Sequence, residues 1–303
     1  MTDALFFLEV LVAGLTSGTL YALVALGFVL IYKASGVFNF AQGVMVLFAA
    51  QTFAGLAIVF GSRSPGDLPF LCALAATAAA MVLLAIVVER VVLRPMVNQS
   101  AISMFMATIA LTFLLDGFTL MLWGSRPVVL DIGVTDDPVE IWQLLVRKLD
   151  IVAVGLVIVV VGALAAFFRW SHLGRALRAV GDDHQAALSI GIPLKQMWVL
   201  VWTVAGLVAL FAGLVWGAKL GVQPSLSVLA LKALPVLILG GFTSVPGAIL
   251  GGLIVGAGEK LAEVYLGPHL GGALENWFAY ALALVFLVFR PQGLMGEKII
   301  ERV

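Results

Sequence analysis

Three charged side chains lie inside long apolar stretches of the sequence: Asp116, Lys232 and Glu259. A charge is costly in hydrocarbon, so it is usually paired with another charge or serves the passage of a solute. An ion pair between Lys232 and either Glu259 or Asp116 would hold helices together. Alternatively, the three charges line a path and meet a zwitterionic solute. The sequence leaves both interpretations open.

Signals for catalysis, metal binding and nucleotide hydrolysis are absent from the sequence. His172, His184 and His269 lack the spacing of metal ligands, and no set of Ser, His and Asp stands in a recognisable catalytic context. The phosphate-binding loop of P-loop ATPases requires a Gly-Lys dipeptide, which the chain does not contain. We therefore expect no metal, no cofactor and no enzymatic activity, and any energy from ATP must come from a different chain.

The composition indicates a membrane protein. Of the 303 residues, 62% are hydrophobic and only 11% are charged, whereas a soluble domain carries roughly 25% charged residues. Lipid must therefore cover most of the outer surface, and only helices or closed barrels satisfy their backbone groups in hydrocarbon. The apolar stretches lack the alternation of barrel strands. The 17 basic residues balance the 17 acidic ones, which gives no argument for nucleic acid as a partner.

The chain contains about eight or nine apolar stretches long enough to enter a membrane, separated by charged residues or by Pro and Gly. Their ranges are 6–32, 37–60, 68–89, 101–123, 149–168, 197–218, 226–242, 246–265 and 273–290. The two ranges around residues 243–246 are short, so they are either half-spans or a tight hairpin. The fold class is therefore an all-α, polytopic membrane bundle with some broken helices, and residues 1–303 form a single transmembrane domain.

Four Gly-xxx-Gly pairs occur within or between these stretches. They are Gly14–Gly18, Gly213–Gly217, Gly247–Gly251 and Gly252–Gly256. Small residues at this spacing let two helices approach closely, so plain packing is their expected role.

The distribution of Lys and Arg predicts the topology, because basic residues in short loops stay on the cytoplasmic side. With the N-terminus outside, ten basic residues lie in cytoplasmic loops and four lie outside. The ten are Lys33, Arg90, Arg94, Arg169, Arg175, Arg178, Lys195, Arg290, Lys298 and Arg302, and the four are Arg63, Arg126, Arg147 and Lys148. The C-terminus is then cytoplasmic.

Two interruptions of the apolar pattern are candidates for a translocation path. One lies at residues 34–43 and the other at residues 240–248. The residues that would line the path are Asn39, Gln42, Gly43, Thr243, Ser244 and Gly247. Paired interruptions in the two halves of a transporter often mark the path, because irregular backbone in a membrane needs protein or water beside it. Alternatively, Asn39 and Gln42 cap a helix and bond to its neighbours, which is a structural role only.

A basic loop, residues 169–195, joins the fifth and sixth stretches. Asp182 or Asp183 can cap a short helix that ends at Gly191, and Pro193 can begin the next segment. A short helix in a basic cytoplasmic loop is suited to docking another protein. Basic composition alone, however, would also suit an ordinary solvated connector.

This loop resembles that of the permease subunits of ABC importers of the branched-chain amino acid (LIV) type. In that family Gly-Arg-Ala-x-Arg-Ala precedes an Ala-Ala-x-x-x-Gly-Ile segment, and residues 174–179 and 186–192 match the two parts. Residues 39–43, 240–252 and 289–294 match further motifs of the family. The resemblance therefore covers nearly the whole chain.

The resemblance implies a multi-pass permease subunit in the bacterial inner membrane that forms the translocation path. Its implied partners are a second, homologous permease subunit, two cytoplasmic ATP-binding subunits, a periplasmic solute-binding protein and membrane lipid. The loop would be the coupling segment that sits in a groove of the ATPase. The residues expected at this contact are Arg175, Arg178, Ala179, Asp182, Ala186, Ala187, Ile190 and Gly191.

The cargo stays open at this point. Similar permeases import branched-chain amino acids, urea and short amides, or aromatic carboxylates. An ion-coupled secondary transporter is the alternative class, because broken helices and intramembrane charges also suit such carriers.

Overall fold

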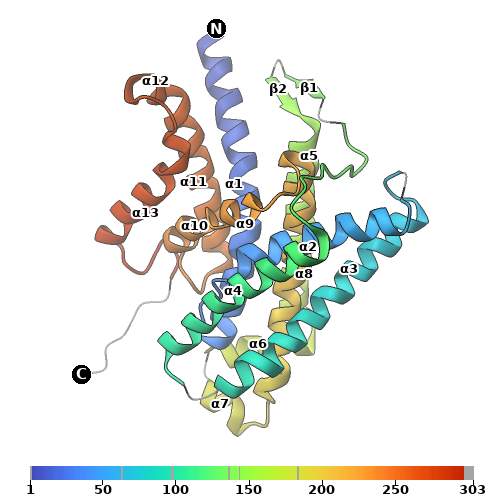
Figure 1. Ribbon diagram of the computed structural model, residues 1–303. Coiled ribbons are helices and arrows are strands. Elements are labelled where there is room, and N and C mark those ends of the chain that lie inside the picture. Colours follow the sequence, from blue (N-terminus) through green and yellow to red (C-terminus); the bar gives the residue numbers. More distant parts are fainter. Residues whose placement is uncertain are drawn as a thin grey trace. The chain divides into compact units, whose positions relative to one another are not determined.

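The computed structural model describes residues 2–62, 64–96, 99–135, 137–142, 144–182 and 184–296, and it is built almost entirely of helices (Figure 1). Within these residues, 7 helices are long and apolar enough to cross a membrane. They are α1 (Thr2–Ser35), α2 (Gln42–Val59), α3 (Leu68–Val87), α4 (Ala101–Trp123), α5 (Lys148–Trp170), α8 (Leu194–Leu220) and α11 (Val245–Tyr265). The polytopic helical class predicted from the sequence is confirmed.

The remaining elements are short. They are α6 (His172–Asp182), α7 (His184–Ser189), α9 (Ser225–Ala230), α10 (Ala233–Gly240), α12 (Gly267–Leu270), α13 (Phe278–Phe289), and the strands β1 (Pro138–Ile141) and β2 (Leu144–Arg147). The apolar stretch 226–242 is thus divided into α9 and α10, which are separated by Leu231 and Lys232. After α3 the chain continues through a π-helical turn, Val88–Leu93, and a 3₁₀ turn, Arg94–Met96.

Local chemistry sets several helix ends. Asp67 accepts a hydrogen bond from the amide of Phe70 at 2.7 Å and so begins α3, and Ser100 begins α4 in the same way. Glycines in the left-handed region terminate helices, because no Cβ opposes that conformation. Gly124 (φ +77°) follows α4 in this way, and Gly221 (φ +79°) follows α8.

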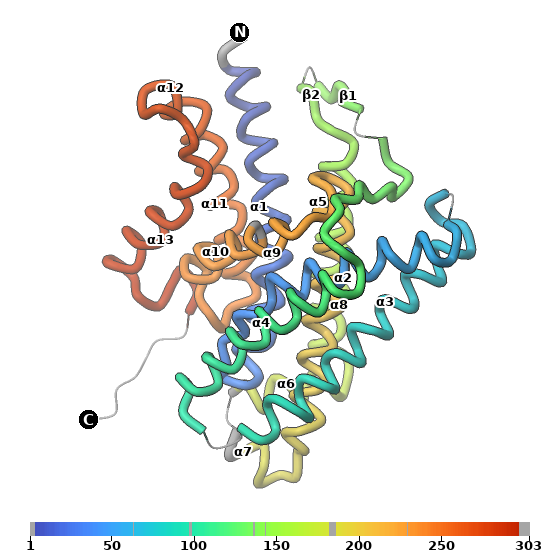
Figure 2. The backbone as a smooth tube through the Cα atoms, viewed as in Figure 1, coloured from blue at the N-terminus to red at the C-terminus, as the bar shows by residue number. Residues whose placement is uncertain are grey.

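The chain forms two compact units. The first comprises residues 1–29, 134–157 and 231–303, and the second comprises residues 30–133 and 158–230. In the first unit, α10, α11 and α13 pack on one another. In the second, α2 contacts α3, α4, α8 and α9, and α3 also packs on α8. Figure 2 shows the backbone path of these helices.

Glycine seams bring helices into close contact within the first unit. The N-terminal half of α1 meets α11 where Gly14 and Gly18 face Gly252 and Gly256. A Cβ added at any of the four would collide with the backbone of the opposite helix. The spacing seen in the sequence therefore does serve packing.

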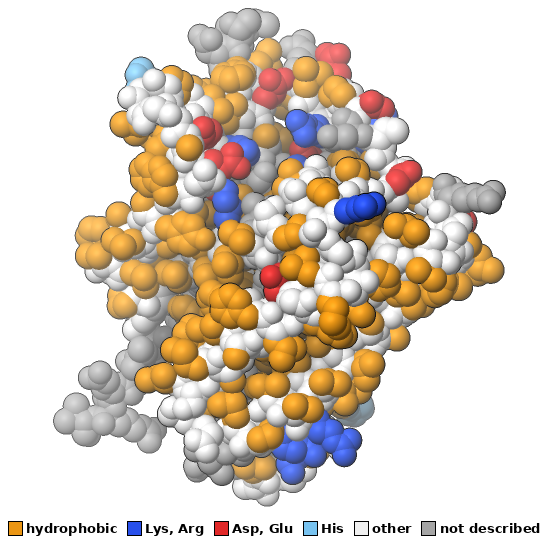
Figure 3. All heavy atoms as spheres, in the orientation of Figure 1, with side chains coloured by type: hydrophobic (Ala, Val, Ile, Leu, Met, Phe, Trp, Pro, Cys, Tyr) orange, Lys and Arg blue, Asp and Glu red, His pale blue; other side chains and the backbone are white. Residues whose placement is uncertain are grey.

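The second unit uses glycine in the same way. Gly213 of α8 lies against the backbone of α2, where an added Cβ would be 2.7 Å from the carbonyl oxygen of Val46. Gly217 is covered by Leu130 and Val222. Figure 3 shows hydrophobic side chains spread over much of the visible face, as lipid contact requires.

The segment between α4 and α5 contains a short antiparallel hairpin. Its register pairs Pro138 with Arg147 and Ile141 with Leu144. Trp142 lies at the turn with a positive φ of 54° and is 93% exposed. Trp123, by contrast, is held against α2, where its Nε1 donates to the Thr52 hydroxyl at 3.2 Å.

Substitution of Gly252 by valine should destabilise the protein by about 1–3 kcal/mol, because the new side chain forces α1 and α11 apart. Thermal unfolding in detergent, followed by the fraction of monodisperse protein, measures this change. The matched control is Gly117→Val on α4, where a Cβ would meet no atom within 4 Å. Equal melting temperatures for the two variants would contradict the role assigned to the seam.

Candidate coupling loop and membrane path

The loop 169–195 folds into two helices, α6 and α7, where one short helix was expected. α6 begins at Ser171, whose hydroxyl accepts from the amide of Gly174 at 2.8 Å. Gly174 lies against the last turn of α5, so that a Cβ there would collide with the carbonyl of Phe167. Leu177 and Val180 are 3% and 0% exposed. These buried side chains pack α6 against the rest of the second unit.

The far end of α6 rests against the end of α1. A Cβ on Gly181 would lie 3.0 Å from the carbonyl oxygen of Lys33. Two glycines, Gly174 and Gly181, therefore let α6 pack closely at both ends. The loop is a fixed part of the second unit rather than an ordinary solvated connector.

The second helix of the loop, α7, ends as the sequence predicted. Gly191 has a φ of +84°, and its amide donates to the carbonyl of Leu188 at 3.0 Å. The amide of Ile192 donates to the carbonyl of Ala187 at 3.0 Å, which closes the helix. The expected caps involve Asp183, which is outside the described residues, and Asp182, whose side chain is not described.

The residues predicted to meet the ATPase fall into two groups. Arg175, Arg178, Ala186, Ile190 and Gly191 are exposed, whereas Ala179 is half-buried and Ala187 is 1% exposed. Ala187 is therefore packed inside the chain itself. An aspartate at this position would destabilise the loop, whether or not a partner is bound. The exposed apolar side chains are those of Leu188 and Ile190, at 54% and 73%.

The two arginines of the loop differ in their surroundings. One guanidinium nitrogen of Arg175 donates to the carbonyl of Trp170 at 3.0 Å, and the other lies 2.9 Å from Nδ1 of His172. Arg175 therefore caps the end of α5. Arg178 is the more available of the two for a contact outside the chain, since it has no hydrogen bond or ion pair to the described residues.

The first interruption of the apolar pattern is a short irregular segment between α1 and α2, and its polar groups are satisfied within the second unit. Asn39 and Gln42 are both 0% exposed. Asn39 accepts from the amide of Ala41 at 3.1 Å and donates to the Gln42 side chain at 3.3 Å. Gln42 in turn donates to the carbonyl of Ala205 on α8 at 3.4 Å. These amides link the start of α2 to a neighbouring helix.

Thr108 of α4 completes this arrangement. Its hydroxyl accepts from the amide of Phe40 at 3.1 Å and donates to the carbonyl of Phe38 at 3.0 Å. Gly43 lets α9 approach α2, because an added Cβ would lie 2.6 Å from the carbonyl oxygen of Ser227. The first half of the divided stretch 226–242 therefore rests beside the start of α2.

The second interruption is a tight hairpin between α10 and α11. Ser244 caps α11 by accepting from the amide of Gly247 at 3.0 Å. Gly240 and Gly247 contact one another so closely that neither site has room for a Cβ. Thr243 is half-buried in the connecting turn.

The Arg-Pro-x-Gly-Leu segment after α13 packs against this hairpin. The amides of Leu294 and Met295 donate to the carbonyls of Leu239 and Gly240 at 2.8 and 3.2 Å. These bonds satisfy carbonyl groups at the end of α10, which a helix end otherwise leaves unpaired. Gly293 has a φ of +79° and would collide with Gly241 if it carried a side chain.

The structure brings Lys232 and Glu259 together in the first unit. Lys232, at the break before α10, places Nζ 2.8 Å from the Glu259 carboxylate, and the two side chains are only 13% and 1% exposed. Nζ also donates to the carbonyl of Glu275 at 3.0 Å. Tyr21 of α1 makes a side-chain hydrogen bond to Glu259 as well. These contacts tie α1, α10, α11 and the turn before α13 to one another.

Lys232 and Glu259 belong to a cluster of charged side chains that also includes Lys260 and Glu275. The sequence did not predict that these last two residues belong to it. Lys260 pairs with the Glu275 carboxylate at 2.8 Å, with side chains 32% and 34% exposed. Glu275 lies in a 3₁₀ turn that the sequence assigned to an apolar stretch, so its proximity to Lys232 depends on how the chain returns from α12. Asp116 lies on α4 in the second unit, where its Oδ1 is buried and has no hydrogen-bond partner in the described part of the chain.

A buried ion pair was also missed at the end of α3. Glu89 is 2% exposed within the π-helical turn and meets Arg94 through two contacts of 3.3 Å. The sequence ended the third apolar stretch at residue 89 and treated Arg94 as a loop residue. The π-helical turn sets the spacing that brings Glu89 and Arg94 together, and this turn was not predicted from the sequence.

Replacement of Lys232 by methionine should lower the free energy of unfolding by about 3 kcal/mol or more, because Glu259 is left buried without its cation. Adding Glu259→Gln should recover part of this loss. The control Lys260→Met removes a more exposed pair and should cost about 1 kcal/mol or less. Thermal melting in detergent compares the three variants, and a Lys232→Met protein as stable as Lys260→Met would refute the buried pair.

Comparisons with known proteins agree with this architecture. Residues 10–290 match the family described as branched-chain amino acid transport system / permease component. The permease protein LivH of the high-affinity branched-chain amino acid transport system of Escherichia coli K12 is 29% identical over 309 residues, covering 99% of this chain and 98% of its own. BraD of Pseudomonas aeruginosa, from a transport system of the same description, is 28% identical over 312 residues, covering 100% of both chains.

More distant likenesses extend over similar lengths. A probable branched-chain amino acid permease protein of Methanocaldococcus jannaschii is 25% identical over 296 residues, covering 91% of this chain and 89% of its own. A solved structure of PsaBC from Streptococcus pneumoniae in complex with a Fab aligns with 96% of this chain and 97% of that chain at 15% identity and a TM-score of 0.49. On the strength of the match over residues 10–290, the chain belongs to the family of permease components of branched-chain amino acid ABC transport systems.

Proposed function

We propose that this protein is the membrane subunit of an ATP-driven importer of branched-chain or related hydrophobic amino acids, and that α6 and α7 receive the motion of a cytoplasmic ATPase. The observation that carries this proposal is the exposure of Leu188 and Ile190 on a loop fixed to the second unit. Two large exposed apolar side chains on the same loop as the exposed Arg178 are suited to a protein groove.

The coupling works through the packing of the loop. α6 contacts the end of α1 through Gly181 and contacts α8, and α8 packs on α2 and α3. A push on α7 would therefore reach several spans at once. Closure of the ATPases would shift these helices and alternate access between the two sides of the membrane.

The proposed topology places this loop in the cytoplasm, the N-terminus outside and the C-terminus inside. Its support is the excess of basic residues in one set of loops. In the second unit the loops before α3, after α4 and after α8 meet at one end, and the proposed topology places all three on the outer side. There Val128 and Val222 exchange backbone hydrogen bonds of 3.0 and 2.7 Å. In this proposal each of the two interruptions, at residues 34–43 and 240–248, contributes residues to the path.

The proposed partners are a second, homologous permease, two ATP-binding subunits and an extracytoplasmic binding protein. Family membership and the lack of a nucleotide motif in the sequence support this proposal. The importer would lie in a bacterial inner membrane.

Aspartates at Leu188 and Ile190 together should reduce ATP-driven leucine uptake at least about ten-fold without lowering the amount of protein in the membrane. Two charges placed in an apolar contact weaken docking. Uptake into proteoliposomes that contain the complete transporter measures this effect, with ATP supplied on the ATPase side.

The matched control is Lys195→Asp, an exposed position of the same loop. Vanadate should abolish uptake by the parent protein, and a protonophore should not. Normal uptake by the Leu188→Asp/Ile190→Asp variant would refute the coupling surface. Uptake that resists vanadate and collapses with the protonophore would favour an ion-coupled carrier.

A further inference from the structure

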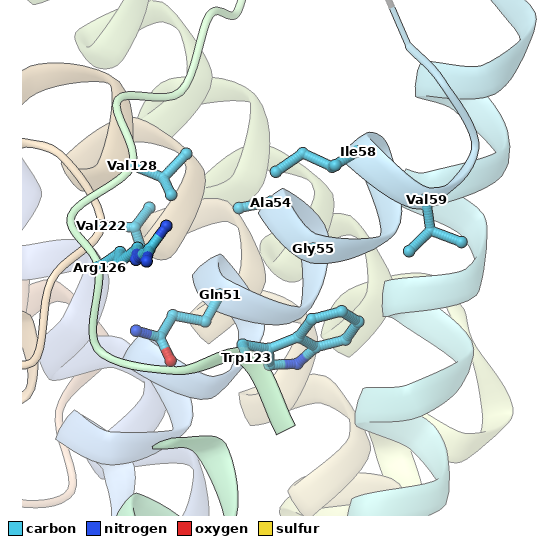
Figure 4. A pocket seen from close by; sticks show the side chains of 9 residues that line it. All are labelled: Gln51, Ala54, Gly55, Ile58, Val59, Trp123, Arg126, Val128 and Val222. Carbon is cyan, nitrogen blue, oxygen red and sulfur yellow. The ribbon is translucent and has the colours of Figure 1, made fainter. Parts of the chain in front are cut away.

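A pocket in the second unit is lined by groups that match an apolar amino acid. Its volume is about 250 Å³, below the roughly 300–1,000 Å³ of pockets for drug-sized ligands. The lining residues are Gln51, Ala54, Gly55, Ile58, Val59, Trp123, Arg126, Val128 and Val222 (Figure 4). Two of them, Gln51 and Arg126, carry polar or charged groups that could bind the backbone groups of an amino acid.

Gln51 presents an unsatisfied acceptor. The side chain is 5% exposed, and its Oε1 is buried without a hydrogen-bond partner in the described residues. An unpaired buried acceptor costs about 1–3 kcal/mol. Figure 4 shows the Gln51 side chain extending from α2 toward the segment that carries Arg126. Rotation of the Gln51 amide turns this oxygen into the pocket, where a donor supplied by a ligand would satisfy it.

Arg126 presents the complementary charge. It is exposed and forms no ion pair or hydrogen bond with the part of the chain that the structure describes. Its guanidinium offers paired donors suited to a carboxylate. In Figure 4 it lies on the same side of the pocket as the Gln51 amide, whereas Trp123 lies across from them.

The surroundings fix the backbone beside Arg126 and the ring of Trp123. The segment after Arg126 is tied down by the paired backbone bonds between Val128 and Val222. Trp123 is fixed by its bond to Thr52, and its ring lies so close to Gly55 that a Cβ there would collide with it. A site whose walls are set before the ligand arrives binds with less loss of freedom.

We propose that this pocket is an entry site for an apolar α-amino acid. The carboxylate of the ligand pairs with Arg126, the ammonium donates to Oε1 of Gln51, and the side chain lies among Ile58, Val128 and Val222. The pocket opens at the end of the second unit where the loops before α3 and after α4 meet. This inference rests on the proposed function, which places that end on the extracytoplasmic side of the membrane.

Protection of an introduced cysteine from a maleimide tests the site. The complete transporter, without its binding protein, is reconstituted with Cys72→Ala and Ile58→Cys, since Cys72 is the one cysteine of the sequence and Ile58 is 68% exposed. Leucine should slow labelling at position 58. Leu145→Cys, at a 62% exposed position on the hairpin, is the matched control and should not be protected.

Two further variants separate the two polar contacts. Arg126→Gln should raise the half-protecting concentration at least about ten-fold for both leucine and 4-methylpentanoate, because both carry a carboxylate. Gln51→Leu should raise it about ten-fold for leucine and leave 4-methylpentanoate unchanged, since that acid lacks the ammonium group.

The proposal is overturned if leucine does not protect position 58, if it protects position 145 equally, or if Arg126→Gln behaves like the parent. ATP-driven uptake by the same proteoliposomes, measured after the binding protein is added, distinguishes the two levels of inference. Normal uptake without protection removes the pocket and leaves the importer. Protection as described without ATP-driven uptake supports the pocket and counts against the proposed function.

Discussion

The structure depends above all on one constraint: a backbone amide or carbonyl in hydrocarbon must find its partner within the protein. Unbroken helices meet this requirement along most of the chain. Where the helices break, side chains and distant segments complete the bonding. Thr108 serves the irregular backbone at Phe38 and Phe40, and Leu294 and Met295 serve the end of α10.

Close helix contact is the second consequence of a lipid solvent. Lipid tails are as apolar as leucine, so helices associate through close packing and not through the expulsion of water. Gly14 and Gly18 on α1 meet Gly252 and Gly256 on α11 for this reason. A closely packed interior transmits the displacement of one helix to its neighbours, because it contains little free space to absorb the movement. The loop 169–195 is joined to this kind of interior, and a force applied to α7 would therefore act on whole helices.

Much of the fold could be predicted from the sequence because hydropathy is a local property. The range 101–123 coincides with α4, and most other ranges differ from the helices by a few residues at each end. α6 was missed, although Leu173, Leu177 and Val180 recur with helical spacing and would have revealed it. The hairpin at Trp142 was missed because its strands are only four residues long.

The candidate site was less predictable, because its members meet only in three dimensions. Sequence spacing left two partners for Lys232, and the fold selects Glu259. Ala187 was expected on an exposed face, but the direction in which α7 packs buries it. Gln51 and Arg126 are 75 positions apart in the sequence numbering, and no local pattern connects them. The backbone bonds between Val128 and Val222 hold the segment after Arg126 beside the end of α8, where Gln51 and Arg126 line the same pocket.

In the proposed importer, α7 lies against an ATPase. This contact is tested most directly by photo-crosslinking from position 190 in the complete transporter. A benzophenone maleimide attached to Ile190→Cys in a Cys72→Ala background should crosslink to the ATP-binding subunit, and the yield should change with nucleotide. The same probe on Leu145→Cys should not reach that subunit. An active transporter in which position 190 gives no ATPase crosslink, or position 145 gives an equal one, would contradict the account.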